Sequence, residues 1–135
     1  MRFMMLVKHA ENQGLPPKEL MDAIGKLAEE AAKAGNMVLS GGLAPTAMST
    51  KVRVSKGQVA AIDGPFTEAK EVVGGFAIFE MKSKEEAIEG AKVFMDLHRK
   101  HWPGWEGETE VRQLFGPEDF PPRPEGTPLA GCGGA

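Results

Sequence analysis

Asp63-Gly64-Pro65-Phe66 is the segment of this sequence whose residue types most directly suggest chemistry. Asp63 is expected to end a strand, and a carboxylate that is partly removed from water there can act as a general base. The same four residues also form a typical turn, in which Asp accepts backbone hydrogen bonds, Gly allows a positive φ and Pro fixes the next φ. Phe66 would then anchor the loop in the core. The residue types favour the turn, and a catalytic Asp63 is the alternative.

His9 and Arg53 are the residues that could assist a catalytic Asp63. His9 ends an apolar segment on the face of Phe3, and if that face lines a cleft the imidazole can exchange a proton near neutral pH. Arg53 could bind a ligand carboxylate through two parallel hydrogen bonds. The simpler alternatives are a His9 that meets solvent and a structural ion pair between Arg53 and a strand glutamate such as Glu80.

A second group of residues could contact a ligand near this turn. In the charged run that follows, Lys70 could orient an anionic ligand, although alternating charges in a loop are usually solvated. Gly74-Gly75 interrupts a predicted strand, which indicates either a bulge or the close approach of a partner subunit or ligand. Arg112 is a strand cation that either pairs with a glutamate such as Glu80 or binds a ligand. The candidate ligand-binding residues are Phe66, Glu68, Lys70, Gly74, Gly75 and Arg112.

His98 and His101 do not by themselves make a metal site. Their spacing supplies two ligands, a zinc site needs a third, and Cys132 is a poor candidate for it. Histidines at the end of a helix interact favourably with its dipole, so packing at the helix end is expected. Trp102 and Trp105 are expected to pack over the sheet or at a dimer edge, and the alternative is that they form the wall of a pocket for an aromatic ligand. Nucleophile, phosphate-binding and metal-binding motifs are absent, so we expect no metal and no cofactor.

Length and composition limit the class of protein. The chain has 135 residues, a net charge of −3 and a single cysteine, which together predict one domain and no disulfide framework. No apolar run reaches the ~20 residues of a membrane helix, and the N-terminal residues lack a signal-peptide pattern. The mildly acidic balance argues against nucleic-acid binding. We therefore expect a cytoplasmic protein that binds neither membranes nor nucleic acid.

The hydrophobic pattern predicts six strands and two helices in the order β-α-β-(β-β hairpin)-β-α-β. Apolar residues recur at helical spacing after Pro17, and Gly35 is placed to cap that helix. Ser83 and Glu86 form a capping-box pattern at the start of the second helix. The predicted strands cover residues 2–9, 37–43, 51–55, 59–62, 72–81 and 109–115, and the predicted helices cover 17–34 and 83–100.

These elements predict an α+β fold, ferredoxin-like β-α-β-β-α-β with an extra hairpin, over residues 1–120. The Pro- and Gly-rich residues 121–135 are expected to form a flexible tail. Two helices can cover only one face of the sheet, yet the strands carry apolar residues on both faces. We therefore expect a second copy of the chain to cover the open face, with a cleft for a ligand between the two sheets.

The run from Asp63 to Glu71 is followed by Gly74-Gly75-Phe76, and further motifs stand at Met4 to Lys8, Ser40 to Pro45 and Glu110 to Arg112. On these residues the sequence resembles the YCII-related family, and within it the DGPF branch. The resemblance spans about residues 1–120 and implies a dimeric α/β barrel built from ferredoxin-like subunits.

The resemblance implies several functions. Some members lie near genes for extracytoplasmic-function sigma factors, and a dehydrochlorinase of the wider family has a proposed His–Asp pair whose His lies on the first helix. Residues 17–34 contain no His here, which disfavours that pair. We expect a homodimer that binds a small organic molecule in its inter-subunit cleft. The alternatives are a cofactor-free lyase or isomerase with Asp63 as the base, and a regulatory or scaffolding partner of a sigma factor. The sequence leaves open whether the protein is an enzyme.

Overall fold

The structure is a computed structural model that describes residues 1–120. The predicted flexible tail, residues 121–135, lies outside the described residues together with Cys132. The elements in chain order are β1 (Arg2–His9), η1 (Glu11–Gln13), α1 (Lys18–Lys33), β2 (Met37–Gly42), η2 (Thr46–Met48), β3 (Thr50–Ser55), β4 (Gln58–Asp63), β5 (Val72–Glu80), α2 (Lys84–His101), β6 (Gly107–Leu114) and η3 (Pro117–Asp119), where η marks a short 3-10 helix.

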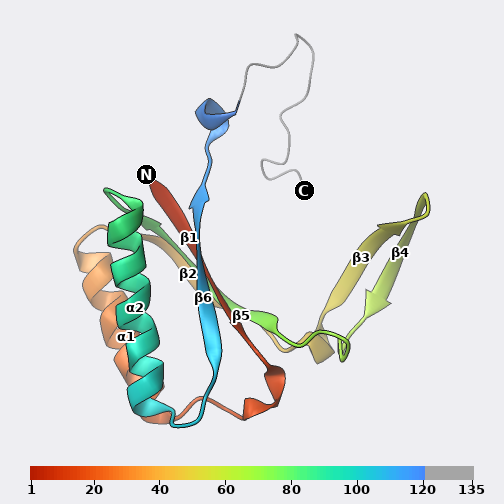
Figure 1. Ribbon diagram of the computed structural model, residues 1–135, viewed down its shortest axis with the longest axis horizontal. Coiled ribbons are helices and arrows are strands. Elements are labelled where there is room, and N and C mark those ends of the chain that lie inside the picture. The colour runs from red at the N-terminus through yellow and green to blue at the C-terminus, as the bar shows by residue number, and fades with distance from the viewer. Residues whose placement is uncertain (121–135) are drawn as a thin grey trace.

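Four of the strands form one antiparallel sheet in the order β2-β5-β1-β6, and β3 and β4 form a separate hairpin (Figure 1). β1 is central, with β5 on one side and β6 on the other. The six strands and two helices predicted from the sequence are all present, and the α+β class is confirmed.

Local signals in the sequence explain where the helices begin and end. Pro17 directly precedes α1, and Gly35 follows it with a φ of 77°, the left-handed conformation that glycine adopts at low cost. The Ser83 hydroxyl accepts a hydrogen bond from the backbone N–H of Glu86 at 3.1 Å and caps α2. The Glu86 carboxylate in turn accepts from the backbone N–H of Lys82 rather than from that of Ser83.

The core lies between the sheet and the two helices, which cover the same face of the sheet (Figure 1). Phe3 and Met5 of β1 are 2% and 5% exposed and pack against Ala87 and Ala91 of α2. Because side chains alternate along a strand, the helix-facing side of β1 is the one that carries its odd-numbered residues. His9 therefore shares the covered face, not a face turned toward a partner.

The opposite face of the sheet has no helix over it within residues 1–120. Met4 and Leu6 of β1 point to this side, opposite Ile78 and Phe76 of β5. Leu39 of β2 lies next to Ile78 and is 55% exposed. We call this surface the open face. It consists of Met4, Leu6, Lys8, Leu39, Phe76, Ile78, Glu108, Glu110 and Arg112.

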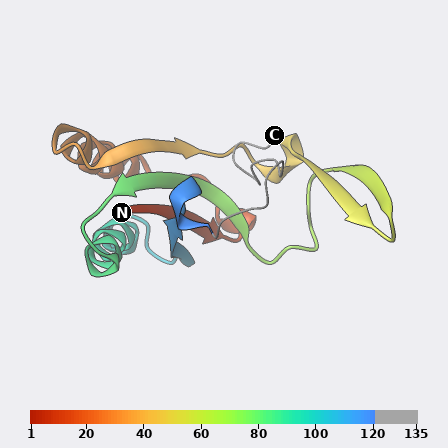
Figure 2. The ribbon, with the colours of Figure 1, turned by 90° about the horizontal axis from the view of Figure 1, so that it is seen from above.

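The β3–β4 hairpin, residues 50–63, is called the arm. Figures 1 and 2 both place it beyond the ends of β2 and β5, on the side away from the helices. Lys56 and Gly57 have φ values of 53° and 77° and make the tight turn at its tip. Within the described residues, the strands of the arm pair only with each other.

Neither helix in the described part of the chain is long and apolar enough to cross a membrane.

Candidate functional site

The Asp63-to-Phe66 turn is held against the segment around η2 by a close backbone approach. A Cβ atom at Gly64 would overlap the backbone carbonyl group of Thr46 and would lie 2.6 Å from its carbon. The Gly64 N–H donates to the carbonyl oxygen of Ser49 at 2.8 Å. Gly64 does not have a positive φ within the described structure, so the predicted reason for this glycine is wrong: it is needed for space, not for backbone conformation.

Glu11 and Thr46 join three segments that are distant in the sequence. The Glu11 carboxylate accepts from the Thr46 backbone N–H at 2.9 Å and from the Thr46 hydroxyl at 2.5 Å. The Thr46 hydroxyl oxygen accepts in turn from the backbone N–H of Phe66 at 3.3 Å. The two hydrogen bonds from Thr46 lower the pKa of Glu11, because they favour the charged carboxylate. This network fixes the turn relative to the end of β1.

An apolar hollow of about 440 Å³ lies between this turn and the segment that follows β2. Phe66 forms part of its wall, so this side chain lies outside the main core that Phe3 and Met5 build. Val73 is also in the wall and pairs with Lys8 of β1, which connects the hollow to the open face. The hollow is lined by Leu43, Ala44, Thr46, Ser49, Lys51, Phe66, Ala69, Glu71, Val72 and Val73.

Lys51 carries the positive charge in the wall of the apolar hollow. Its ammonium lies 4.1 Å from the centre of the Phe66 ring, within the range of a cation–π contact. It also forms a 3.0 Å ion pair with Glu68. A hydrogen bond from its own backbone N–H and the contact with Lys51 lower the pKa of Glu68. The positive charge of Lys51 is therefore already balanced by a carboxylate.

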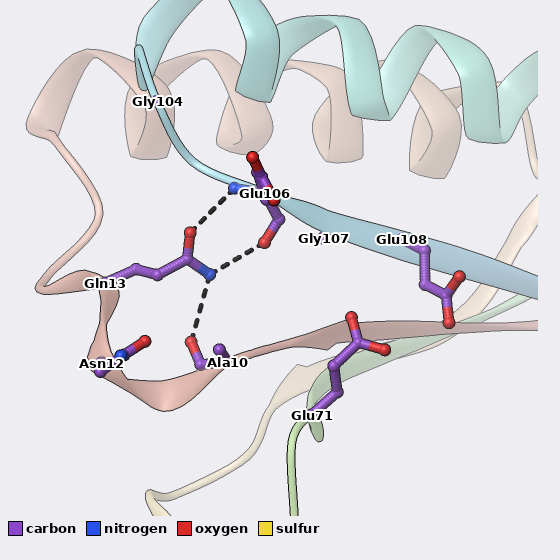
Figure 3. A pocket seen from close by; sticks show the side chains of 8 residues that line it. All are labelled: Ala10, Asn12, Gln13, Glu71, Gly104, Glu106, Gly107 and Glu108. Carbon is purple, nitrogen blue, oxygen red and sulfur yellow. Dashed lines mark hydrogen bonds between the residues drawn. The ribbon is translucent and has the colours of Figure 1, made fainter.

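A second, acidic hollow of about 470 Å³ lies where β1 ends and β6 begins (Figure 3). The Gln13 amide donates to the backbone oxygens of Ala10 at 3.2 Å and Glu106 at 2.8 Å, and its oxygen accepts from the Glu106 N–H at 2.8 Å. These hydrogen bonds of Gln13 hold the end of β1 and the start of β6 together at this wall of the hollow. The residues that line the hollow are Ala10, Asn12, Gln13, Glu71, Gly104, Glu106, Gly107 and Glu108.

The carboxylates around the acidic hollow do not form a metal site. Glu71 also lines the apolar hollow, and Figure 3 shows the side chains of Glu71 and Glu108 beside β1. Across residues 1–120, no three His, Cys, Asp or Glu side chains are grouped so as to hold a metal ion.

The three residues predicted to act in catalysis lie in different surroundings. Asp63 ends β4 with an exposed side chain, and its carboxylate accepts a hydrogen bond from the Thr50 hydroxyl at 2.8 Å. Arg53 is exposed in the middle of β3, opposite Ala60. Among the described residues, no hydrogen bond or ion pair joins Asp63, Arg53 and His9, so their joint catalytic role stays a prediction.

His9 belongs to an aromatic cluster beneath the sheet. A Cβ at Gly74 would lie 2.7 Å from the Cδ2 of the His9 ring, which explains glycine there, and Gly74 is also the extra residue of a bulge in β5. The His9 ring is 6.2 Å from that of Trp105, which in turn is 4.5 Å from that of His98. Burial lowers the pKa of His98, and the nearby His9 adds to that effect. The predicted packing of His98 at the helix end is confirmed.

The comparison with protein families shows to which family this chain is related. The model of the YCII-related domain matches residues 1–93. The chain belongs to the YCII-related family. An uncharacterised protein of Rhizobium meliloti (strain 1021) is 30% identical over 101 residues, which is 75% of this chain and 77% of that relative. Since the relative's name gives no activity, the function of this YCII-family protein has to be argued from its sites.

The region that matches the family model, residues 1–93, covers the two hollows to different extents. All the residues of the apolar hollow lie within residues 1–93, whereas Gly104, Glu106, Gly107 and Glu108 of the acidic hollow lie beyond them. The family match therefore covers the whole apolar hollow and only part of the acidic one.

The structure separates the residues predicted to bind a ligand in the YCII-family chain. Phe66 lines the apolar hollow and Glu68 holds Lys51 at its wall, whereas Lys70 is exposed and forms no ion pair within residues 1–120. Gly75 is buried, and a Cβ there would lie 3.3 Å from the backbone oxygen of Gly41. The bulge at Gly74 confirms one of the two explanations given for the glycine pair, and the close approach of a partner subunit or ligand stays a prediction.

The predicted ion pair with a strand glutamate is confirmed for Arg112, but the partner is not the suggested Glu80. Arg112 forms its ion pair with Glu110, two residues earlier on β6, and Glu80 instead pairs with Arg2 at 2.8 Å. The reason is register, because Arg2 lies directly opposite Glu80 whereas Arg112 lies opposite Met4. Arg53 forms no ion pair in the described part of the chain.

Sequence reasoning missed Gln13, Thr46 and Lys51, which line the two hollows, and Glu11, which holds Thr46 in place. Their contacts span 35 residues for Glu11–Thr46 and 93 residues for Gln13–Glu106, so no local spacing reveals them. For Lys51 a signal did exist, since its alternation with Val52 on an amphipathic strand places it on the side away from the exposed valines.

Proposed function

We propose that this YCII-family protein, of the DGPF branch, is a homodimer of ferredoxin-like subunits that binds a small organic molecule in the apolar hollow. The observation that carries the proposal is the hollow itself, a cavity of about 440 Å³ between the two turns that carry the family resemblance. Ligand sites typically have volumes of about 300–1,000 Å³ with mostly apolar walls and a few polar groups.

The open face supports the homodimer. Phe76, Ile78 and Leu39 form a continuous apolar strip that no element of the described chain covers. Contiguous apolar patches of this kind mark interaction surfaces, and a self-complementary surface closes in a two-fold dimer. The strand order β2-β5-β1-β6 with both helices on one face supports the ferredoxin-like assignment. A partner on the open face would cover Val73 and turn the hollow into an inter-subunit cleft.

The charges in the wall disfavour an anionic ligand, because Lys51 is already paired and Glu71 adds a carboxylate to the otherwise largely apolar lining. The pairing of Lys51 with Glu68 leaves the wall without a free cation for an anionic ligand. Phe66 offers an aromatic face, and the Lys51 ammonium and the Ser49 hydroxyl are the polar groups that can orient a single hydroxyl or carbonyl group.

Catalysis by Asp63 and partnership with a sigma factor stay predictions from the sequence. A general base must reach the proton that it removes, and the exposed Asp63 carboxylate on the arm is hydrogen-bonded to Thr50 and does not line the apolar hollow. The binding function has a cavity to support it, whereas no observed feature specifically favours either alternative.

The test combines oligomeric state with a ligand screen. Sedimentation at micromolar concentration should give twice the chain mass of 14.5 kDa. In a thermal-shift screen of small phenols, ketones and aliphatic alcohols, some compounds should raise Tm, since a ligand at 100 times its Kd adds about 2.7 kcal/mol of stability.

Matched variants locate the binding in the hollow. Ala69→Phe narrows the apolar hollow and should abolish the shifts, whereas Ala32→Phe, on the exposed surface of α1, should leave them unchanged. A monomeric protein, or compounds that bind both variants equally, would refute the proposal.

A further inference from the structure

We propose that the arm is an intermolecular clamp: its valine face packs against the open face of the partner subunit, so that the two chains of the dimer exchange arms. This inference rests on the proposed homodimer and adds a contact surface that dimerisation of the sheets alone does not require. It assigns a role to the least covered element of the described structure.

The arm has one apolar face that its own chain does not bury. Cross-strand pairing places Val52, Val54, Val59 and Ala61 on the same side of the hairpin. The three valines are 72%, 73% and 70% exposed. The other side carries mainly polar residues, including Lys51, Arg53 and Gln58. This alternation is the pattern of a strand pair that covers a hydrophobic surface on one side and meets water on the other.

The arm also lacks the support that an isolated hairpin needs. A two-stranded hairpin without further strands or a helix against it is marginally stable in water. Within residues 1–120, β3 and β4 pair with no third strand, and Gly64, Thr46 and Ser49 hold only the base of the arm. A partner surface against the valines would supply the missing support.

A second copy of the chain fits this role best. The arm extends away from the helices, on the side of the sheet where the open face lies (Figures 1 and 2). A stable interface uses about 20–30 residues and about 800 Å² on each partner. The open face has nine residues and is too small for such an interface by itself, and the four apolar residues of the arm's valine face enlarge it. Two-fold symmetry would bury both arms at once.

The first experiment compares dimer affinity in valine variants. The variant Val52→Thr, Val54→Thr and Val59→Thr keeps the β-branched shape that strands favour and makes the face polar. Val93→Thr is the control, because Val93 is 51% exposed on α2, away from the arm. Sedimentation over a concentration series should show the dimer Kd at least 100-fold weaker for the triple variant and unchanged for the control.

The second experiment identifies what the arm touches. A photo-crosslinking amino acid replaces Val54 in an equimolar mixture of ¹⁴N- and ¹⁵N-labelled chains, and mass spectrometry then distinguishes links within a chain from links between chains. Mixed-isotope links to peptides that contain Met4, Leu39 or Phe76 are expected.

The outcomes separate the two levels of the proposal. A wild-type monomer would overturn both the dimer and the clamp. A wild-type dimer that the triple variant matches in Kd, or crosslinks confined to single chains, would overturn the clamp alone and leave the dimer in place.

Discussion

Gly64→Ala is the substitution with the most specific structural consequence. The new methyl group would overlap the Thr46 carbonyl, with its carbon 2.6 Å from the carbonyl carbon. Carbon atoms in ordinary contact lie about 3.5–4.0 Å apart, so the turn and the η2 segment must separate by roughly 1 Å or more. The obstacle is backbone on both sides, so no side-chain rotation can relieve it.

The expected cost follows from the contacts that this separation stretches. These are the hydrogen bonds from the Gly64 N–H to Ser49, 2.8 Å, and from the Phe66 N–H to the Thr46 hydroxyl, 3.3 Å. Each contributes about 1 kcal/mol, and overpacking adds typically 1–3 kcal/mol. We expect a loss of about 3 kcal/mol in the stability of the turn. Because the turn lies at the periphery, part of this loss should appear as local opening rather than as global unfolding.

Two measurements test this expectation. Native-state hydrogen exchange should show the amides of Gly64 and Phe66 exchanging roughly 100-fold faster, the factor that corresponds to about 3 kcal/mol at 1.4 kcal/mol per tenfold change. Urea unfolding reports the global part. Gly25→Ala is the matched control, since a Cβ there meets no atom within 4 Å in α1, and it should stabilise the protein by about 1 kcal/mol.

The reasoning would be refuted if Gly64→Ala exchanged at the wild-type rate and unfolded within about 0.5 kcal/mol of the wild type, the range of a neutral surface substitution. Such a result would mean that the approach of the two segments is loose enough to accept a side chain.

Three further predictions concern the core and the helices. Burial lowers the pKa of His98, so the unfolded chain binds this proton more readily, and the free energy of unfolding should fall as pH drops below the ordinary value of 6.5. Urea unfolding at pH 7.5 and 5.5 should show a decline of up to about 1.4 kcal/mol per pH unit that is absent in His98→Phe, and an equal decline in both proteins would contradict the assignment. Ser83→Ala removes the hydroxyl that caps α2 and should cost about 1 kcal/mol in urea unfolding, with Ser55→Ala on the exposed arm as a neutral control. Leu20→Ala empties a site that is 1% exposed and should lower Tm through a loss of about 2–5 kcal/mol, whereas Leu15→Ala, at 90% exposure, should leave Tm unchanged.

The order of the elements could be predicted because each depends on signals within a few residues. Ser83 and Gly35 mark helix ends through hydrogen bonds and backbone conformation of their own segments. The same is true of the Lys56-Gly57 turn, which joins β3 to β4. The family relationship could also be recognised, because its motifs are continuous in the sequence.

The side of β1 that the helices cover could not be predicted in this way. Phe3 and Met5 alternate with Met4 and Leu6, and both sets are apolar, so periodicity gives two equivalent answers. Packing of Phe3 and Met5 against α2 decided between them and placed His9 on the covered side. The prediction that His9 assists Asp63 assumed that the side of β1 with Phe3 and Met5 lines a cleft.

The sequence by itself determined the α+β class, the positions of the strands and helices, and membership of the YCII-related family, because local hydrogen bonding and continuous motifs carry that information. Only the tertiary structure decided which segments meet. Glu11 finds Thr46 across 35 residues, and Gly64 is required by the Thr46 backbone rather than by its own φ. Contacts of this kind depend on how separate elements pack, and it is these contacts that form the apolar hollow and leave the arm uncovered.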